Sequence, residues 1–288
     1  MFRVGIIGAE NSHAKKFATL FRDDPDFNDI KVVAVGGHYA DSNIKLYEEF
    51  ELDMIAESPE DMLGKVDAVI ITARDGIYHA EFARPFLEAG LPMFIDKPFT
   101  VDENEAVEFA REAKKRGVPL VGGSTLKCSY DTMMLANEVR TKSADIKGGS
   151  VAAPIQMESP YSGFFFYASH LTEASLKIFG YDPKNITAFR KGNDVTAYVE
   201  YDRYAVTNNF NDHCMSYFGQ VFKTDGIYSR NLEYSLASKV MAADFANMLR
   251  YGVMSDSYRE LVYPVFYMNA VKRSYETGKT VELEKIEI

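Results

Sequence analysis

Short apolar runs alternate with longer amphipathic segments along the first part of the chain. Each run is apolar on both sides of an extended strand, whereas each longer segment carries its apolar residues on one helical face. Such alternation is typical of a parallel sheet that helices cover on both faces. The pattern predicts strands at 2–7, 30–35, 54–55, 66–71, 91–95 and 118–121, and helices at 13–22, 42–50, 77–89 and 100–116.

The hydrophobic period changes further along the chain. Val195, Ala197 and Val199 alternate with more polar residues, which indicates a strand with one buried face. Strands at 186–190, 195–201, 205–210 and 215–222 follow one another through short turns, so an antiparallel sheet is expected. Helices are predicted at 131–141, 170–179, 235–251 and 257–276, and the glycine-containing segment 142–160 reads as an irregular connector.

These patterns predict an α/β protein with two domains. We expect residues 1–122 to form a doubly wound (Rossmann) parallel sheet that binds a dinucleotide. Residues 123–288 are expected to form an α+β domain with a mostly antiparallel sheet, which serves substrate binding and oligomerisation.

The turn after the first strand departs from the usual dinucleotide motif. That motif has three glycines, spaced G-x-G-x-x-G. Aligned on Gly8, Glu10 occupies the second glycine position and His13 the third. A carboxylate at Glu10 should repel a pyrophosphate and limit dinucleotide affinity, unless it turns outward. The acid expected after the second strand, for the ribose hydroxyls, is replaced by Gly37 followed by His38.

The strand expected at 91–95 ends abruptly in Asp96-Lys97-Pro98. Pro98 cannot donate to a strand ladder and disfavours helix at the preceding residue, so the strand must stop there. Lys97 is therefore delivered at the carboxyl end of a buried strand, the edge at which open α/β sheets bind ligands. A surface lysine is the alternative interpretation.

Taken in order, these pieces resemble the Gfo/Idh/MocA oxidoreductases, a family that includes glucose–fructose oxidoreductase and inositol dehydrogenase. Asp96-Lys97-Pro98 looks like the Glu-Lys-Pro signature of that family, with a conservative Asp. The ordered set spans nearly the whole chain. It comprises Val4-Gly5-Ile6-Ile7-Gly8, Val69-Ile70-Ile71-Thr72 with His79, Glu88-Ala89-Gly90, Asp96-Lys97-Pro98, Gly117-Val118-Pro119-Leu120-Val121-Gly122-Gly123, and segments 163–170, 181–201 and 274–281.

The resemblance implies catalytic roles for Lys97 and His170. In relatives the lysine lies at the nicotinamide and the substrate hydroxyl, so Lys97 and His170 are expected to converge on one hydroxyl in the crevice between the domains. The aspartate that normally precedes the histidine by four residues is Phe166 here, and either Tyr167 or Glu173 is a candidate for the lost group. The alternative is that His170 merely caps its helix.

The resemblance also implies an NAD or NADP cofactor and a hydride transfer to or from a sugar, cyclitol or related polyol. The alternative is an altered family member that binds a small ligand with little or no dinucleotide, which Glu10, Gly37 and Phe166 favour. The residues expected at the cofactor are Gly8, Ala9, Glu10, Asn11, Ser12, His13, Gly37, His38, Thr72, Arg74, His79, Asp96 and Lys97.

Composition and charge limit the kinds of partner that the protein is expected to bind. A formal net charge of -10 argues against nucleic acid and anionic membranes. Cys128 and Cys214 are isolated, so neither a disulfide framework nor a metal site is expected. The sequence shows no signal-peptide pattern and no long apolar run, so we expect a cytoplasmic protein. The alternating sheet of residues 186–222 favours a homodimer or a dimer of dimers.

Overall fold

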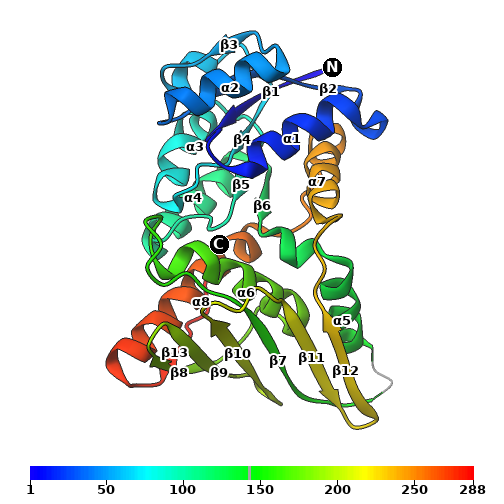
Figure 1. Cartoon of the computed structure of the whole chain (residues 1–288), viewed down its shortest axis with the longest axis vertical. Coiled ribbons are helices and arrows are strands. Elements are labelled where there is room, and N and C mark those ends of the chain that lie inside the picture. Colours follow the sequence, from blue (N-terminus) through cyan, green and yellow to red (C-terminus); the bar gives the residue numbers. More distant parts are fainter. Residues whose placement is uncertain (142–143) are drawn as a thin grey trace. The chain divides into compact units, whose positions relative to one another are not determined.

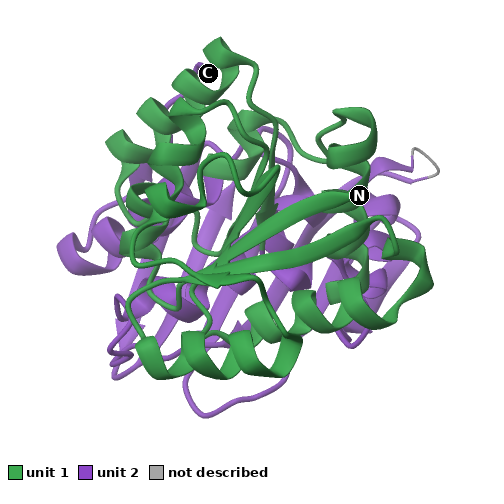
Figure 2. Cartoon of the chain, turned by 90° about the horizontal axis from the view of Figure 1, so that it is seen from above, with its two compact units in different colours: residues 1–123, 238–262, 288 green, residues 124–237, 263–287 purple. Residues whose placement is uncertain are grey.

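The computed structural model of the chain describes residues 1–141 and 144–288. These residues form two compact units, coloured green and purple in Figure 2. Unit 1 comprises residues 1–123, 238–262 and 288, and unit 2 comprises residues 124–237 and 263–287. Each unit has its own sheet, so a late segment of the chain completes the unit that the early strands build.

Unit 1 is organised around a six-stranded sheet with the order β3-β2-β1-β4-β5-β6. All its strand pairs are parallel. This is the strand order of doubly wound dinucleotide-binding sheets. In such sheets the strands stay parallel, but their order across the sheet reverses between β1 and β4. The predicted Rossmann-type sheet is thus confirmed. The strands are β1 (Phe2–Ile7), β2 (Ile30–Gly36), β3 (Met54–Ile55), β4 (Ala68–Ile71), β5 (Met93–Asp96) and β6 (Leu120–Gly123) (Figure 1).

Helices that follow these strands complete unit 1, and a helix from late in the sequence joins them. Phe245 lies 6.0 Å from Phe21 and 6.4 Å from Phe94, measured between ring centroids. Arg250 donates to Asp29 at 2.8 Å. Hydrophobic packing and an ion pair therefore attach this late helix to the parallel-sheet unit. The helices are α1 (Ser12–Asp23), α2 (Ala40–Phe50), α3 (His79–Glu88), α4 (Glu103–Arg116) and the late α7 (Ala237–Tyr251).

Unit 2 contains a seven-stranded sheet with the order β12-β11-β7-β10-β9-β8-β13. Only the pair β7 and β10 is parallel among its described strand pairs, so the prediction of a mostly antiparallel sheet is confirmed. Helix α6 (Phe164–Phe179) packs on β7 and β10, and α5 (Tyr130–Arg140) packs on β11 and β12. The strands are β7 (Ile146–Pro154), β8 (Asn185–Lys191), β9 (Asp194–Glu200), β10 (Ala205–Asn211), β11 (Phe218–Lys223), β12 (Gly226–Asn231) and β13 (Val281–Glu282); the last helix is α8 (Tyr258–Thr277).

The prediction of an irregular connector at 142–160 is wrong for residues 146–154. Residues 142–143 lie outside the described residues, but Ile146–Pro154 forms β7, between β10 and β11. A Cβ at Gly149 would lie 2.3 Å from Cζ of Phe179, a residue of α6. The glycines that suggested a loop therefore permit close packing of a helix on a central strand.

Helix α6 begins at Phe164, six positions before the predicted start at 170. Its N-cap residue is Gly163, so the interpretation that His170 merely caps the helix is wrong. Phe164 and Phe165 are buried, and an aromatic run of this kind has no helical period that a sequence pattern would reveal. His170 consequently lies inside the helix, beyond its first turn.

Candidate active site

The turn after β1 is compact because Gly8 leaves no room for a side chain. Gly8 has φ +103°, and a Cβ there would lie 2.1 Å from the backbone N of Ala73. Thr72 Oγ1 donates to the carbonyl oxygens of Ile7 and Gly8, at 3.2 and 3.1 Å. Only glycine fits this position, as the first glycine of a dinucleotide turn requires.

Glu10 is bound to the backbone of the loop that follows β4. Its Oε1 accepts a hydrogen bond from Arg74 N at 2.8 Å. Its Oε2 is buried and has no hydrogen-bond partner among the described residues. The carboxylate thus supports a neighbouring loop instead of simply turning outward. Two predicted cofactor residues flank it, the half-buried Ala9 and the exposed Ser12 at the start of α1.

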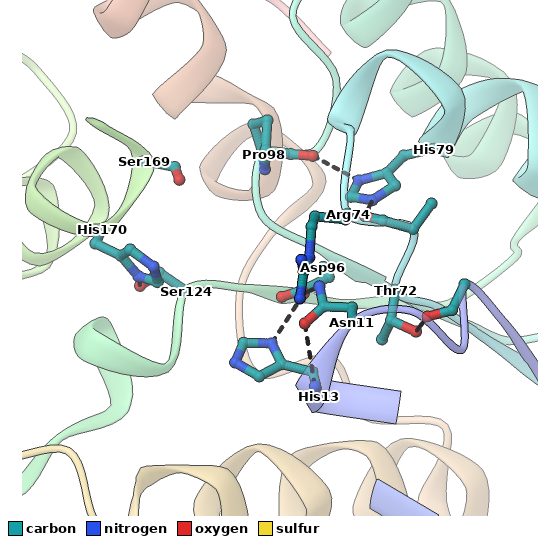
Figure 3. Close-up of polar contacts among 12 residues, drawn as sticks. Asn11, His13, Thr72, Arg74, His79, Asp96, Pro98, Ser124, Ser169 and His170 are labelled. Atoms are coloured by element: carbon teal, nitrogen blue, oxygen red, sulfur yellow. Dashed lines mark hydrogen bonds and ion pairs between the residues drawn. The ribbon is translucent and has the colours of Figure 1, made fainter. Parts of the chain in front are cut away.

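Asp96 ends β5 and is the centre of a buried polar group that we call the Asp96 cluster, formed by Asn11, His13, His79, Asp96 and Lys97. Asp96 Oδ2 lies 2.8 Å from His13 Nδ1 and accepts from Asn11 Nδ2 at 3.2 Å (Figure 3). Asn11 also caps α1, because its Oδ1 accepts from His13 N at 3.1 Å. The third glycine position is therefore occupied by an imidazole that binds the signature carboxylate.

The surroundings of Asp96 keep it ionised. Burial by itself raises the pKa of a carboxyl group. The charge and hydrogen bond of His13, with the charges of Lys97 and His79, outweigh that effect and hold the pKa of Asp96 well below its ordinary value. Asp96 Oδ1 is buried and lacks a hydrogen-bond partner within residues 1–141 and 144–288. The cluster thus contains a carboxylate with one oxygen still able to accept.

His79 connects two loops at the same sheet edge. Its Nδ1 lies 2.7 Å from the carbonyl oxygen of Pro98, and its Nε2 lies 2.7 Å from that of Ala73 (Figure 3). The side chain is fully buried. Both ring nitrogens therefore engage backbone, which fixes the segment that carries Lys97 relative to the loop after β4.

The end of β2 offers no carboxylate. Gly37 has φ +123°, and a Cβ there would lie 3.0 Å from Gly8 N. His38 is exposed, and its ring contacts the rings of Tyr78 and Phe82 edge-on, at centroid distances of 4.6 and 4.7 Å. His38 thus places an aromatic ring just after β2. It follows Gly37, which occupies the position where an acid was expected.

Unit 2 contains a second polar group, the His170 cluster, in which Ser124, Lys127 and Glu173 are buried and Tyr167 and His170 are partly exposed. Ser124 Oγ lies 2.7 Å from His170 Nδ1, and Glu173 Oε2 accepts from Ser124 N at 2.7 Å. Helix α6 therefore holds Ser124 twice, by its hydroxyl and by its amide. Ser124 and Lys127 were missed from the sequence, because neither belongs to a recognisable motif.

A buried ion pair supports this arrangement. Lys127 Nζ lies 3.4 Å from Glu173 Oε2, and each residue is 3% exposed. Mutual attraction offsets part of the cost of removing the two charges from water. Glu173, a candidate for the lost aspartate, thus binds Ser124 and Lys127.

Aromatic rings surround the histidine. The Tyr167 ring lies 5.6 Å from His170, and the Tyr217 ring lies 6.3 Å from it. Burial raises the pKa of Tyr217, which keeps it a neutral phenol. Phe166 contacts the rings of Tyr161 and Tyr167, each at 5.3 Å. The position of the family aspartate has therefore become part of an aromatic group.

The described residues contain no group of three or more His, Cys, Asp and Glu side chains placed to hold a metal ion. Their helices include none that is both long and apolar enough to span a membrane. Neither Cys128 nor Cys214 is in a disulfide. The prediction that Lys97 and His170 converge on one hydroxyl involves both units and stays a prediction.

Comparison with known proteins identifies the class. Residues 2–124 match the family model GFO_IDH_MocA, described as "Oxidoreductase family, NAD-binding Rossmann fold". The match assigns residues 2–124 to the NAD-binding fold of that oxidoreductase family. Over these residues the resemblance to the Gfo/Idh/MocA family is confirmed. No curated protein sequence matches the chain.

Solved structures share the fold over nearly the whole chain. A myo-inositol dehydrogenase from Corynebacterium glutamicum has a TM-score of 0.85 at 16% identity, over 99% of this chain and 100% of that chain. A myo-inositol 2-dehydrogenase from Lactobacillus plantarum has a TM-score of 0.86 at 16% identity, with 98% and 99% covered. A scyllo-inositol dehydrogenase from Lactobacillus casei, with bound NAD(H) and scyllo-inositol, has a TM-score of 0.86 at 14% identity, with 98% and 99% covered. Both units thus have counterparts in single chains of these proteins.

Proposed function

We propose that this protein is an NAD(P)-dependent dehydrogenase or reductase that transfers a hydride between a nicotinamide and a cyclitol or related polyol. The observation that carries the proposal is the buried, ionised Asp96 beside Lys97, at the carboxyl end of β5 in a sheet of dinucleotide-binding order. The match of residues 2–124 to the model of an oxidoreductase family supports the reaction type. The inositol dehydrogenases with the same fold support the substrate class.

The residues of unit 1 fit a dinucleotide. Gly8 permits the tight turn, and α1 begins directly after it, so the helix dipole favours an anion at this end. Asp96 Oδ1 is a buried acceptor that lacks a donor within the described residues, and a dinucleotide carries ribose hydroxyls and a carboxamide that can donate. Asn11, His13 and Asp96 would hold the cofactor from this edge of the sheet. When bound, the nicotinamide accepts or supplies the hydride.

The chain's own groups would handle the oxygen and the proton of the substrate. Lys97 is a cation that polarises a substrate oxygen and favours its ionised form. His170 is a candidate to hydrogen-bond the same oxygen. Gly123 pairs with Asp96 in the first sheet, and the next residue, Ser124, contacts His170. This continuity of the chain supports the proposal that Lys97 and His170 serve one reaction.

One observation favours the alternative of a ligand-binding relative with little dinucleotide affinity. Glu10 brings a carboxylate, with one buried oxygen that has no partner in the described part of the chain, into the turn that should receive a pyrophosphate. The end of β2 also lacks an acid for ribose hydroxyls. These features would weaken dinucleotide binding without altering the fold.

Calorimetric titration of the purified protein with NADH and with NADPH tests the proposal. We expect saturable binding of at least one of them, followed by NAD(P)-dependent oxidation of scyllo-inositol, myo-inositol or a related polyol. Absence of binding heat with both nucleotides, for a folded protein, would contradict the dehydrogenase and leave the ligand-binding alternative. The comparison of the two nucleotides also decides between NAD and NADP.

A further inference from the structure

Two side chains of α6, one turn apart, form hydrogen bonds with Ser124. His170 Nδ1 lies 2.7 Å from Ser124 Oγ, and Glu173 accepts from Ser124 N at 2.7 Å. Ser124 is fully buried, and Lys127 pairs with the same carboxylate oxygen of Glu173 at 3.4 Å. The hydroxyl of Ser124 therefore has a fixed place beside the imidazole.

The other hydrogen bonds of Ser124 determine the direction of its hydroxyl proton. Leu126 N donates to Ser124 Oγ at 3.1 Å, which uses the oxygen as an acceptor. A serine hydroxyl has one proton to donate. Within the described residues, the acceptor at hydrogen-bond distance from Ser124 Oγ is His170 Nδ1. Donation from Ser124 to Nδ1 is the arrangement that gives this hydroxyl proton an acceptor, and a neutral imidazole that accepts at Nδ1 carries its proton on Nε2.

We propose that Ser124 is a positioning residue that holds neutral His170 as its Nε2–H tautomer, so that the ring offers a hydrogen-bond donor to the substrate oxygen. The proposal rests on the proposed function, in which His170 reaches that oxygen. A neutral imidazole in this state polarises an oxygen but cannot take a proton at Nε2. The hydroxyl proton then passes to another group, for which Lys97 is the candidate: its neutral amine accepts the proton and becomes the ammonium that polarises the substrate oxygen.

The identity of the partner at Nδ1 is decisive for this role. A carboxylate only accepts, so it would fix the proton on Nδ1 and leave Nε2 as a base. A hydroxyl can donate its one proton to Nδ1 while its oxygen accepts from a backbone N–H, and that donation favours the opposite tautomer. The hydrogen bond from Leu126 N to Ser124 Oγ therefore connects a local turn to the chemistry of His170.

Long-range ¹H–¹⁵N spectra of protein labelled with ¹⁵N-histidine test the tautomer directly. The chain has five histidines, and His170→Gln identifies the signals of His170. At about pH 8, above the usual histidine pKa of about 6.5, we expect the Nε2–H pattern for His170. An Nδ1–H pattern in the unaltered protein would overturn the proposal.

Variants of Ser124 test the cause. Ser124→Ala should remove the tautomer preference, so that His170 shows mixed signals, whereas Ser124→Thr keeps a hydroxyl and should restore the Nε2–H pattern. Ser169→Ala is the matched control, because Ser169 is also buried on α6 and its Oγ donates to the carbonyl oxygen of Phe166 at 3.3 Å. An unchanged Nε2–H pattern in folded Ser124→Ala would overturn the role of Ser124. If that variant does not fold, the unaltered protein still decides the tautomer.

The spectra are recorded without dinucleotide or substrate. A protein that shows the Nε2–H pattern but binds neither NADH nor NADPH would contradict the proposed function and leave the tautomer intact. A protein that binds NADH but shows Nδ1–H would contradict the role of Ser124 alone.

Discussion

The two carboxylate oxygens of Asp96 have different surroundings. Oδ2 is bound by His13 and Asn11, whereas Oδ1 is buried without a partner among the described residues. Asp96 replaces the signature glutamate, and His13 replaces the third glycine of the dinucleotide motif. These two departures therefore belong together, because the two side chains bind each other. The imidazole of His13 occupies the space beside the shorter side chain and supplies it with a hydrogen bond.

Asp96→Asn tests the contribution of this pair to stability. The pKa of Asp96 is lowered on folding, so the stabilisation is present above the unfolded pKa of about 3.9 and is lost as the pH falls through the folded value. We expect the variant to lose roughly 3 kcal/mol at neutral pH, the scale for removing one partner of a buried pair. Urea denaturation at several pH values measures the difference from the unaltered protein. A difference that stayed constant down to about pH 3 would show that ionisation of Asp96 contributes nothing.

Glu10 combines a structural contact with an unfavourable charge, and two substitutions separate these effects. Glu10→Gln keeps an acceptor for Arg74 N and removes the charge, so NADH should bind more tightly, by about 5-fold or more for a coupling of about 1 kcal/mol. Glu10→Gly removes both, so the gain from the lost charge is reduced by a looser loop after β4. Calorimetry compares the three proteins. Equal affinity for Glu10→Gln and the unaltered protein would show that the carboxylate does not act on the cofactor.

Sequence reasoning located the candidate residues unevenly, for a physical reason. Lys97 was found because a proline ends a strand in a way that any chain must obey. Ser124 was missed because its role depends on contacts with His170 and Glu173, which lie far from it in the sequence. Side-chain partners that are brought together only by tertiary packing leave no local pattern.

At the level of elements, the parallel sheet was predicted well because each of its strands contains consecutive apolar residues. Strand β7 was not predicted, because its glycines and its flanking residues resemble those of a loop. What makes them a strand is the approach of α6, which Gly149 permits. The start of α6 was missed for a similar reason, since its first turn is uniformly aromatic.

Gly149→Ala tests that packing. The added methyl group would lie 2.3 Å from Cζ of Phe179 and 2.5 Å from the backbone oxygen of Gln220, and the backbone cannot easily retreat. We expect a loss of roughly 3 kcal/mol, the upper part of the range for overpacking. Gly219→Ala is the control in the same sheet, because its methyl would meet the end of the flexible Leu135 side chain at 2.7 Å. Thermal unfolding compares both variants, and equal losses would contradict the role assigned to close packing at Gly149.

At the level of the whole molecule, the second sheet presents one face that α5 and α6 cover and one that they do not. On β9, the buried Val195, Ala197 and Val199 point to the covered face, so the exposed Tyr198 points away. The strand registers place Phe189 and Ile227 on the same outer face as Tyr198. Both are 67% exposed, so large apolar side chains gather on this outer face of the sheet.

We predict that two copies of this chain pair through that outer face, because a sheet face is self-complementary about a two-fold axis. Light scattering should give twice the chain mass of 32.4 kDa at micromolar concentration. Phe189→Glu places a charge on the face and should weaken the dimer by at least 10-fold, since an unpaired charge in an interface costs more than 1.4 kcal/mol. Tyr251→Glu, at a residue of α7 that is 72% exposed, is the matched control and should leave the mass unchanged. A monomeric unaltered protein would contradict the predicted dimer. A dimer that Phe189→Glu does not weaken would show that the contact lies elsewhere.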